Sequence, residues 1–195
     1  MRIAGGLYRG RAIAAPPGEA IRPTSDRARQ AVFNILTHAA WAEGVEDARV
    51  IDLFAGTGAM GLEALSRGAA FCLFVDTDET ARGAIRRNLE ALAPGGALVG
   101  RGRIHRRDAT ALGEKPASDG AAFDLAFLDP PYGKGLGARA LTSLAAGGWL
   151  KPGAICVLEQ GAEEPAPEAA GYELLDQRRY GAARIHILKR SPGAD

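Results

Sequence analysis

The feature that most constrains the fold is a short apolar run followed at once by a glycine-rich turn. Residues 50–54 read Val-Ile-Asp-Leu-Phe, as a buried strand does, and residues 56–61 follow as Gly-Thr-Gly-Ala-Met-Gly. A helix is expected from this turn to about Arg67. A strand that leads through a helix to another strand favours a parallel sheet, because the crossover returns the chain in the same direction.

The rest of the chain repeats this alternation of strand and helix. Further strands are predicted over residues 71–75, 102–107, 123–128 and 154–158. A helix follows the second strand, and its apolar face carries Ala81, Ile85, Leu89 and Leu92. Another helix is predicted over residues 135–146, and residues 171–190 predict an antiparallel hairpin at the sheet edge. The predicted class is therefore α/β, with a mostly parallel sheet and helices on both faces.

A short extension precedes this core. Residues 1–15 predict a hairpin, and Thr24 or Ser25 can cap a helix that runs through about His38. A chain of 195 residues suffices for one domain. We expect a basic N-terminal extension over 1–40, a core over 41–190 and a frayed tail over 191–195.

Composition excludes several classes of protein. The chain is 47% hydrophobic and 24% charged, but no apolar run approaches the roughly 20 residues of a membrane helix. The N-terminus lacks the apolar segment of a signal peptide. Cys72 and Cys156 lie far apart inside apolar runs, which argues against a disulfide framework or a zinc site. We expect a cytoplasmic protein, monomeric, with no metal and no membrane partner.

The net charge of +1 conceals two basic ends around an acidic middle. Residues 1–30 hold six arginines against Glu19 and Asp26, residues 177–195 are also basic, and residues 110–176 are acidic. Two interpretations remain open. The arginines reflect codon usage, or the two ends form an anion-binding surface, since guanidinium groups suit phosphate.

The glycine-rich turn also has competing interpretations. Asp76 follows Gly56 by 20 residues and ends the second strand, close to the dinucleotide-binding pattern in which the acid binds ribose hydroxyls. A tight structural turn is the alternative. Asp52 argues against a dinucleotide, because a carboxylate inside the first strand would crowd a pyrophosphate. It suits instead a ligand with a cationic end.

Residues 129–132 read Asp-Pro-Pro-Tyr and follow the fourth strand, at the edge where such folds bind ligands. Two prolines fix the backbone, so the loop can aim the Asp129 carboxylate, the Pro130 carbonyl and the Tyr132 ring at a planar amine. The two acceptors would favour the pyramidal, nucleophilic form of the nitrogen, and the ring would stack on a base. The alternative is a proline-stiffened turn with a helix-capping aspartate.

Taken together, the two motifs resemble those of the S-adenosylmethionine-dependent methyltransferases. Residues 52–58 resemble the loop that wraps the methionine part of the cofactor, and residues 129–132 resemble the signature of amino-group methyltransferases. The resemblance implies a Rossmann-like class I fold, a single methyltransferase domain whose seven-stranded sheet ends in the antiparallel hairpin. It implies cofactor contacts at Asp52, Phe54, Ala55, Gly56, Thr57, Gly58, Asp76 (ribose) and Asp108 (adenine). It implies catalytic roles for Asp129, Pro130 and Tyr132.

Two of these acids have structural alternatives. Asp76 could cap the following helix, a role that Thr77 or Asp78 could fill equally well. Asp108 could be a solvated loop acid.

The N-terminal sequence narrows the substrate. Adenine N6 in DNA, guanine N2 and the glutamine amide of release factors are all substrates of enzymes with the second motif. Residues 22–36 closely resemble the N-terminal signature of the bacterial family that methylates N2 of guanine 966 in 16S ribosomal RNA. Residues 52–69 and Tyr180-Gly181 match that family too. The resemblance implies 16S RNA in an assembling 30S subunit as partner. The basic ends agree with this, and we expect RNA contacts from Arg22, Thr24, Arg27, Arg29 and Arg178.

Two alternatives remain beside this hypothesis. One is another enzyme of the same class, a DNA adenine or release-factor glutamine methyltransferase. The other is a non-catalytic RNA-binding assembly factor that keeps the fold, and it would bind RNA without binding the cofactor.

Overall fold

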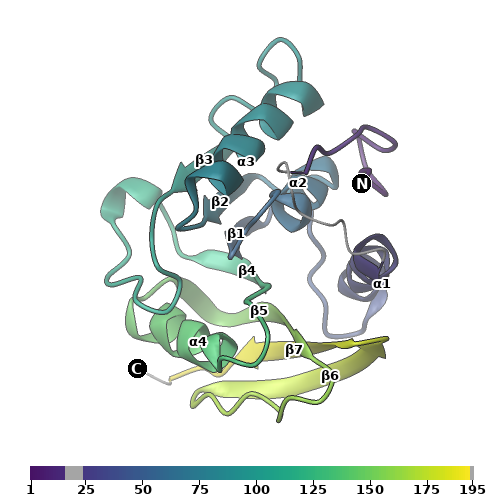
Figure 1. The fold of residues 1–195 in the computed structure, drawn as a ribbon. Helices are drawn as coiled ribbons and strands as arrows, with labels where there is room; N and C mark the ends of the chain where they lie inside the picture. The colour runs from purple at the N-terminus through teal and green to yellow at the C-terminus, as the bar shows by residue number, and fades with distance from the viewer. Residues whose placement is uncertain (16–23, 194–195) are drawn as a thin grey trace.

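The computed structural model describes residues 1–15 and 24–193, and its centre is one seven-stranded sheet (Figure 1). The strands are β1 (Arg49–Leu53), β2 (Phe71–Val75), β3 (Gly102–His105), β4 (Phe123–Leu128), β5 (Leu150–Gly161), β6 (Tyr172–Tyr180) and β7 (Ala183–Arg190). Their order is β3-β2-β1-β4-β5-β7-β6. Strands β1 to β5 are parallel, and β7 runs antiparallel between β5 and β6. The predicted sheet and its C-terminal hairpin are confirmed.

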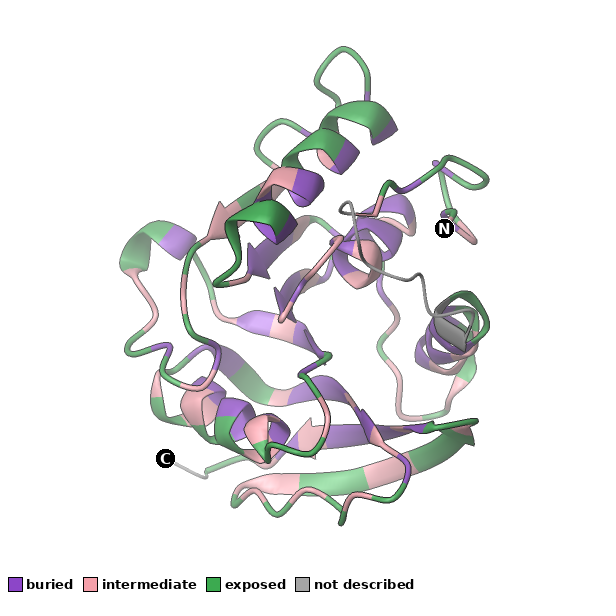
Figure 2. Cartoon of the chain, in the orientation of Figure 1, coloured by how far each residue is buried: buried purple, intermediate pink, exposed green. Residues whose placement is uncertain are grey.

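Helices cover both faces of the sheet, as predicted. One face carries α1 (Thr24–His38), α2 (Ala59–Ser66) and α3 (Glu79–Leu92). The other carries α4 (Leu136–Ala146) and part of the chain before the short 3-10 helix η1 (Ala117–Asp119). The burial pattern follows these layers, because the inner strands are buried and the outward helix faces are exposed (Figure 2).

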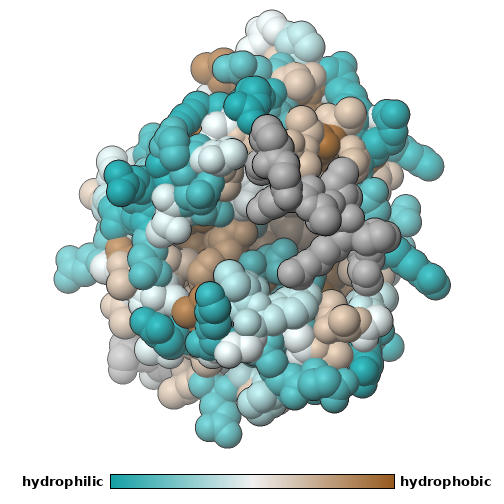
Figure 3. Space-filling view, viewed as in Figure 1, coloured by the Kyte–Doolittle hydropathy of each residue, from teal (hydrophilic) through white to brown (hydrophobic). Residues whose placement is uncertain are grey.

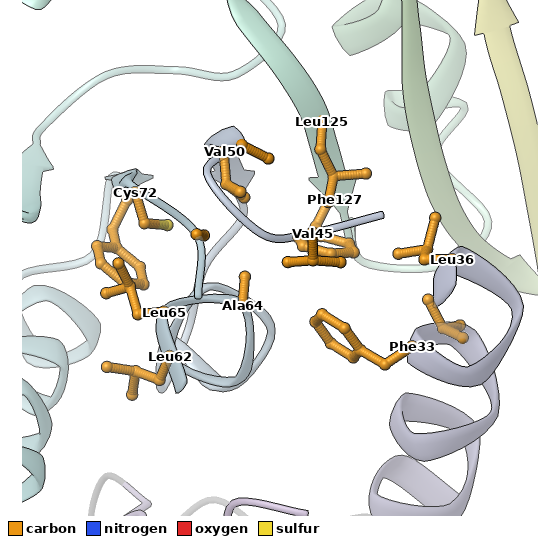
Figure 4. Close-up of a cluster of buried hydrophobic side chains, with 14 of the residues drawn as sticks. Phe33, Leu36, Val45, Val50, Leu62, Ala64, Leu65, Cys72, Leu125 and Phe127 are labelled. Carbon is orange, nitrogen blue, oxygen red and sulfur yellow. The ribbon is translucent and has the colours of Figure 1, made fainter. Parts of the chain in front are cut away.

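The face under α1, α2 and α3 holds the larger of two hydrophobic clusters (Figure 4). Phe33 of α1 packs on Phe127 of β4, with 5.4 Å between the ring centroids. Leu62 and Leu65 of α2 join the same cluster. Fully burying an apolar side chain of this size contributes about 1.5–3 kcal/mol. This packing therefore fixes α2, and with it the glycine-rich turn, on the sheet.

The N-terminal extension is docked on the core. The predicted hairpin exists as one antiparallel bridge between Arg2 and Ala12 rather than as two regular strands. The backbone N–H of Leu7 donates to the carbonyl of Ser66 at 2.7 Å, and Tyr8 N–H donates to the Ser66 hydroxyl at 2.9 Å. The extension is thus anchored to the C-terminal end of α2.

Strand β5 differs most from its predicted bounds. It begins at Leu150, and a register irregularity against β4 accommodates Pro152, which lacks a backbone donor. It ends at Gly161 because pairing with β7 continues after β4 has ended. Strand β5 therefore projects past β4 at the carboxyl edge. Strand β3, in contrast, is shorter than predicted and ends at His105.

Two kinds of feature are absent from the described residues. No helix in residues 1–15 and 24–193 is long and apolar enough to cross a membrane. The same residues contain no group of three or more His, Cys, Asp or Glu side chains arranged to hold a metal ion.

Candidate active site

Acidic residues mark the carboxyl edge of four neighbouring strands. Asp76 follows β2, Asp52 lies near the end of β1, Asp129 follows β4 and Glu159 lies in β5. Asp52 is in register with Phe74 and Phe127, which places it on the sheet face covered by α1, α2 and α3. In the space-filling view a hollow with an apolar floor lies over the region of β1 and β4, with hydrophilic residues to its left and below it (Figure 3).

The glycine-rich turn between β1 and α2 has an unusual backbone. Phe54, Gly56 and Gly58 all have positive φ, at 55°, 54° and 78°. Only glycine adopts such angles without cost, so the non-glycine at Phe54 is held there by its surroundings. Side chains brace the turn: Gly56 N–H donates to Asp76 at 2.9 Å, and the Asn88 amide donates to the Thr57 carbonyl at 3.0 Å.

Asp52 supports this turn from below. Its carboxylate accepts the N–H of Gly61, in the first turn of α2, at 2.9 Å, and its side chain is buried. Burial raises the pKa of Asp52 well above its usual value, and the charges of Asp129 and Asp76 raise it further, against the lowering effect of the Gly61 bond. The cofactor contact predicted for Asp52 stays a prediction. In the structure the buried carboxylate holds the glycine-rich turn through its hydrogen bond to Gly61.

The two acids that follow β2 and β3 occupy different settings. Asp78 caps α3 by accepting the N–H of Ala81 at 2.8 Å, so Asp76 is not the helix cap. Asp76 is half-buried beside the glycine-rich turn. Asp108 is exposed, and one of its oxygens accepts from the Thr110 hydroxyl and N–H at 2.7 and 2.8 Å. These two bonds lower the pKa of Asp108, and the bond from the Thr110 hydroxyl has the larger effect.

The loop after β4 brings its motif to the same edge. The N–H of Asp129 donates to the Leu53 carbonyl at 3.4 Å, which extends the pairing with β1 by one residue. Pro130 is buried and Asp129 is exposed at the edge. The Tyr132 hydroxyl donates to Glu159 at 2.5 Å. The loop therefore presents a carboxylate and an aromatic ring beside the turn after β1.

The predicted RNA-contacting residues divide into three groups. Arg22 lies outside the described residues, and so does the side chain of Thr24, although Thr24 begins α1. Arg27 on α1 is exposed. Arg178 on β6 is also exposed, and its guanidinium pairs with Asp176 at 3.0 Å.

Arg29 does not fit its predicted role. Its side chain is only 2% exposed, and it pairs with Asp26 at 2.9 Å and with the fully buried Glu63 at 3.5 Å. It also donates to the carbonyl of Arg2 at 2.5 Å. A guanidinium enclosed in this way cannot reach a phosphate, so the RNA contact predicted for Arg29 is corrected to a structural role. It ties α1 and the extension to α2.

Replacing Glu63 by alanine is expected to lower the free energy of unfolding by about 3–5 kcal/mol, because Arg29 would remain buried without its carboxylate. Glu63 also pairs with Arg67 at 2.7 Å and accepts the N–H of Ala4 at 2.8 Å. Urea unfolding measures the change, and the exposed Glu90 replaced by alanine is the control. A cost below about 1 kcal/mol for Glu63→Ala would contradict a structural role for the network.

Sequence reasoning missed three residues, two beside the site and one in the network that holds α1 and the extension on α2. Asn88 carried a signal, since it is a polar residue three positions after Ile85 on the apolar face of its helix. Glu63 is likewise a charge in an otherwise apolar helix. Glu159 carried a weaker signal in the sequence, because it directly follows a predicted strand at the edge where ligands bind. Their partners are distant in the sequence, so only the fold reveals what they contact.

The strand order and the two loops at the ends of β1 and β4 define the class, which is the Rossmann-like class I methyltransferase fold. A ribosomal protein L11 methylase of Lactobacillus delbrueckii shares it at 16% identity and a TM-score of 0.62, over 92% of this chain and 85% of that one. The chain belongs to the family described as conserved hypothetical protein 95, whose model matches residues 1–189.

Two similar proteins match nearly the whole chain. Ribosomal RNA small subunit methyltransferase D of Escherichia coli is 33% identical over 191 residues, which are 97% of this chain and 90% of that protein. A solved structure of an Escherichia coli protein is 31% identical with a TM-score of 0.81, and the match covers 100% of this chain and 99% of the other.

Proposed function

We propose that the protein transfers a methyl group from S-adenosylmethionine to N2 of a guanine in 16S ribosomal RNA, at position 966 in the usual numbering. The observation that carries this proposal is the match to ribosomal RNA small subunit methyltransferase D over 97% of the chain, with residues 129–132 at the carboxyl edge. We further propose that the whole chain is one methyltransferase domain. It would act as a monomer in the cytoplasm, on an assembling 30S subunit.

The residues present fit this cofactor. Its sulfonium and ammonium groups are cationic, and a nearby positive charge would offset the mutual repulsion of Asp52, Asp76 and Asp129. Asp76 can accept ribose hydroxyls while its bonds to Gly56 and Asp78 hold it in place. The glycine-rich turn would enclose the methionine part, with Asp108 near the adenine. When bound, the cofactor supplies an electrophilic methyl group.

The chain's own residues would prepare the nucleophile. The Asp129 carboxylate and the Pro130 carbonyl would each accept one hydrogen of the guanine amine, and Tyr132 would hold the base by stacking. These contacts orient the nitrogen lone pair and favour its pyramidal form, so catalysis rests on position and electrostatics. The base must leave its helix, because N2 lies in the minor groove of paired RNA.

Incubation with labelled S-adenosylmethionine and unmethylated small subunits, followed by nucleoside analysis, tests the proposal. N2-methylguanine at one position is the expected product. Label in N6-methyladenine or in protein would identify one of the other amine substrates instead. RNA binding without any binding of S-adenosylhomocysteine would identify a non-catalytic factor.

Replacing Arg27 by alanine is expected to weaken binding to small subunits, since an exposed guanidinium on α1 would no longer contact phosphate. The slope of log K against log salt should become shallower by about 1 between roughly 50 and 200 mM salt. Lys151→Ala is the control, because Lys151 pairs with Asp124 near the opposite edge of the sheet. An unchanged slope for Arg27→Ala would remove Arg27 from the RNA-binding surface.

A further inference from the structure

Glu159 lies where β5 runs past the end of β4. Leu158 is in register with Leu128, so Glu159 stands level with Asp129 on the neighbouring strand, about 5 Å away along the sheet. Glu159 also pairs with Ile185 of β7, a member of the cluster under α1, α2 and α3. The carboxylate therefore lies on the same sheet face as Asp52. Asp129 and Glu159 together border one part of the carboxyl edge.

Tyr132 holds the Glu159 carboxylate in place. Its hydroxyl donates to Oε1 at 2.5 Å, and its ring lies beside Gly161, where an added Cβ would come within 3.4 Å of Cδ2. In the described part of the chain, no lysine or arginine forms an ion pair with Glu159. An ionised carboxylate has about four acceptor positions, so the bond from Tyr132 leaves capacity for a ligand.

Guanine and adenine differ in the ring nitrogen next to the amino group that would be methylated. On guanine, the 2-amino group has N1–H as its neighbour, and both are donors. On adenine, the amino group has an unprotonated N1 as its neighbour, which a carboxylate repels. A flipped base is read through such hydrogen bonds on its pairing edge.

We propose that Glu159 determines specificity for guanine by accepting N1–H, while Asp129 and the Pro130 carbonyl accept the hydrogens of N2. The inference rests on the proposed function and names the residue that would choose the base at that site. Tyr132 then has two roles, since its ring stacks on the base and its hydroxyl fixes the carboxylate. The pair of carboxylates on adjacent strands reads two adjacent donors of one base.

Small subunits reconstituted on 16S RNA with either guanine or 2,6-diaminopurine at the target position test this directly. The analogue keeps the 2-amino group but presents an acceptor at N1. The wild-type protein should prefer guanine by at least about a hundredfold in kcat/KM, because the analogue leaves the carboxylate facing a lone pair. Glu159→Gln, whose amide can donate, should lower kcat/KM for guanine and raise it for the analogue. The preference should then fall to within about tenfold.

Tyr132→Phe is the matched control, because it keeps Glu159 and the ring but removes the hydroxyl. It should lower kcat/KM for both substrates and retain the preference for guanine. Equal losses on both substrates in Glu159→Gln would show that Glu159 only supports Tyr132, and would overturn the inference. So would a wild-type protein that methylates both substrates equally, a result that does not depend on how any variant folds. If the wild-type protein forms no N2-methylguanine on the guanine-bearing subunits, the proposed function itself fails.

Discussion

Asp129→Ala is expected to lower the rate of methyl transfer about a thousandfold or more, while the affinity for S-adenosylhomocysteine stays within about threefold of wild type. Asp129 follows β4, beside the proposed position of the amine, and it is not part of the glycine-rich turn that would enclose the cofactor. Single-turnover methylation measures the first quantity, and calorimetric titration measures the second.

Asp129→Asn is the matched control for that variant. It keeps one acceptor oxygen in the same place, so it should be at least about tenfold faster than Asp129→Ala. Near wild-type turnover in Asp129→Ala would refute the amine-positioning mechanism. A parallel loss of cofactor affinity would assign Asp129 to the cofactor site instead.

Gly58→Val is expected to act on cofactor binding instead, with affinity for S-adenosylhomocysteine lower by at least about a hundredfold. Gly58 has φ of 78°, and an added Cβ would lie 3.2 Å from Ile85 and from Phe74. A β-branched residue would be strained there and would also push α3 and β2 away. The free energy of unfolding should fall by about 2–4 kcal/mol.

Gly113→Val is the control that separates backbone strain from the steric contacts of the new side chain. Gly113 has a similar φ of 69°, but no atom lies within 4 Å of its added Cβ, and it lies outside the candidate site. This variant should lose only about 1–3 kcal/mol from backbone strain and should bind S-adenosylhomocysteine normally. If Gly58→Val binds the cofactor as tightly as the wild type, the turn after β1 does not enclose it.

The parts of the fold set by local pattern were predictable. Apolar runs, caps and glycine positions predicted the class, the mostly parallel sheet and the closing hairpin, since each depends on a few consecutive residues. The ends of β5 were not predictable, because they depend on pairing with β7 and on a register irregularity against β4. The N-terminal hairpin was only partly right, since the docking of residues 1–15 on α2 shapes it more than its own turn does.

The candidate site likewise has parts that depend on consecutive residues and parts that depend on distant partners. The contiguous motifs at residues 52–58 and 129–132 could be found because each spans one strand end and one turn. The RNA contact predicted for Arg29 is wrong because the sequence does not show that Glu63, 34 positions away, is its buried partner. The charge of a residue predicts its chemistry, but burial decides whether a ligand can reach it.

For the proposed substrate, the carboxylates at the ends of β2, β4 and β5 would also discriminate between groups of opposite charge that approach this edge. Neutral and cationic groups can enter such an edge, whereas each RNA nucleotide carries a negative phosphate that is repelled from it. Only the uncharged base of the RNA could pass these carboxylates. The sugar-phosphate backbone of the RNA would stay outside, beside the exposed arginines. The overall charge of +1 is then the sum of basic segments that would face the RNA backbone and acidic residues that would face a single base.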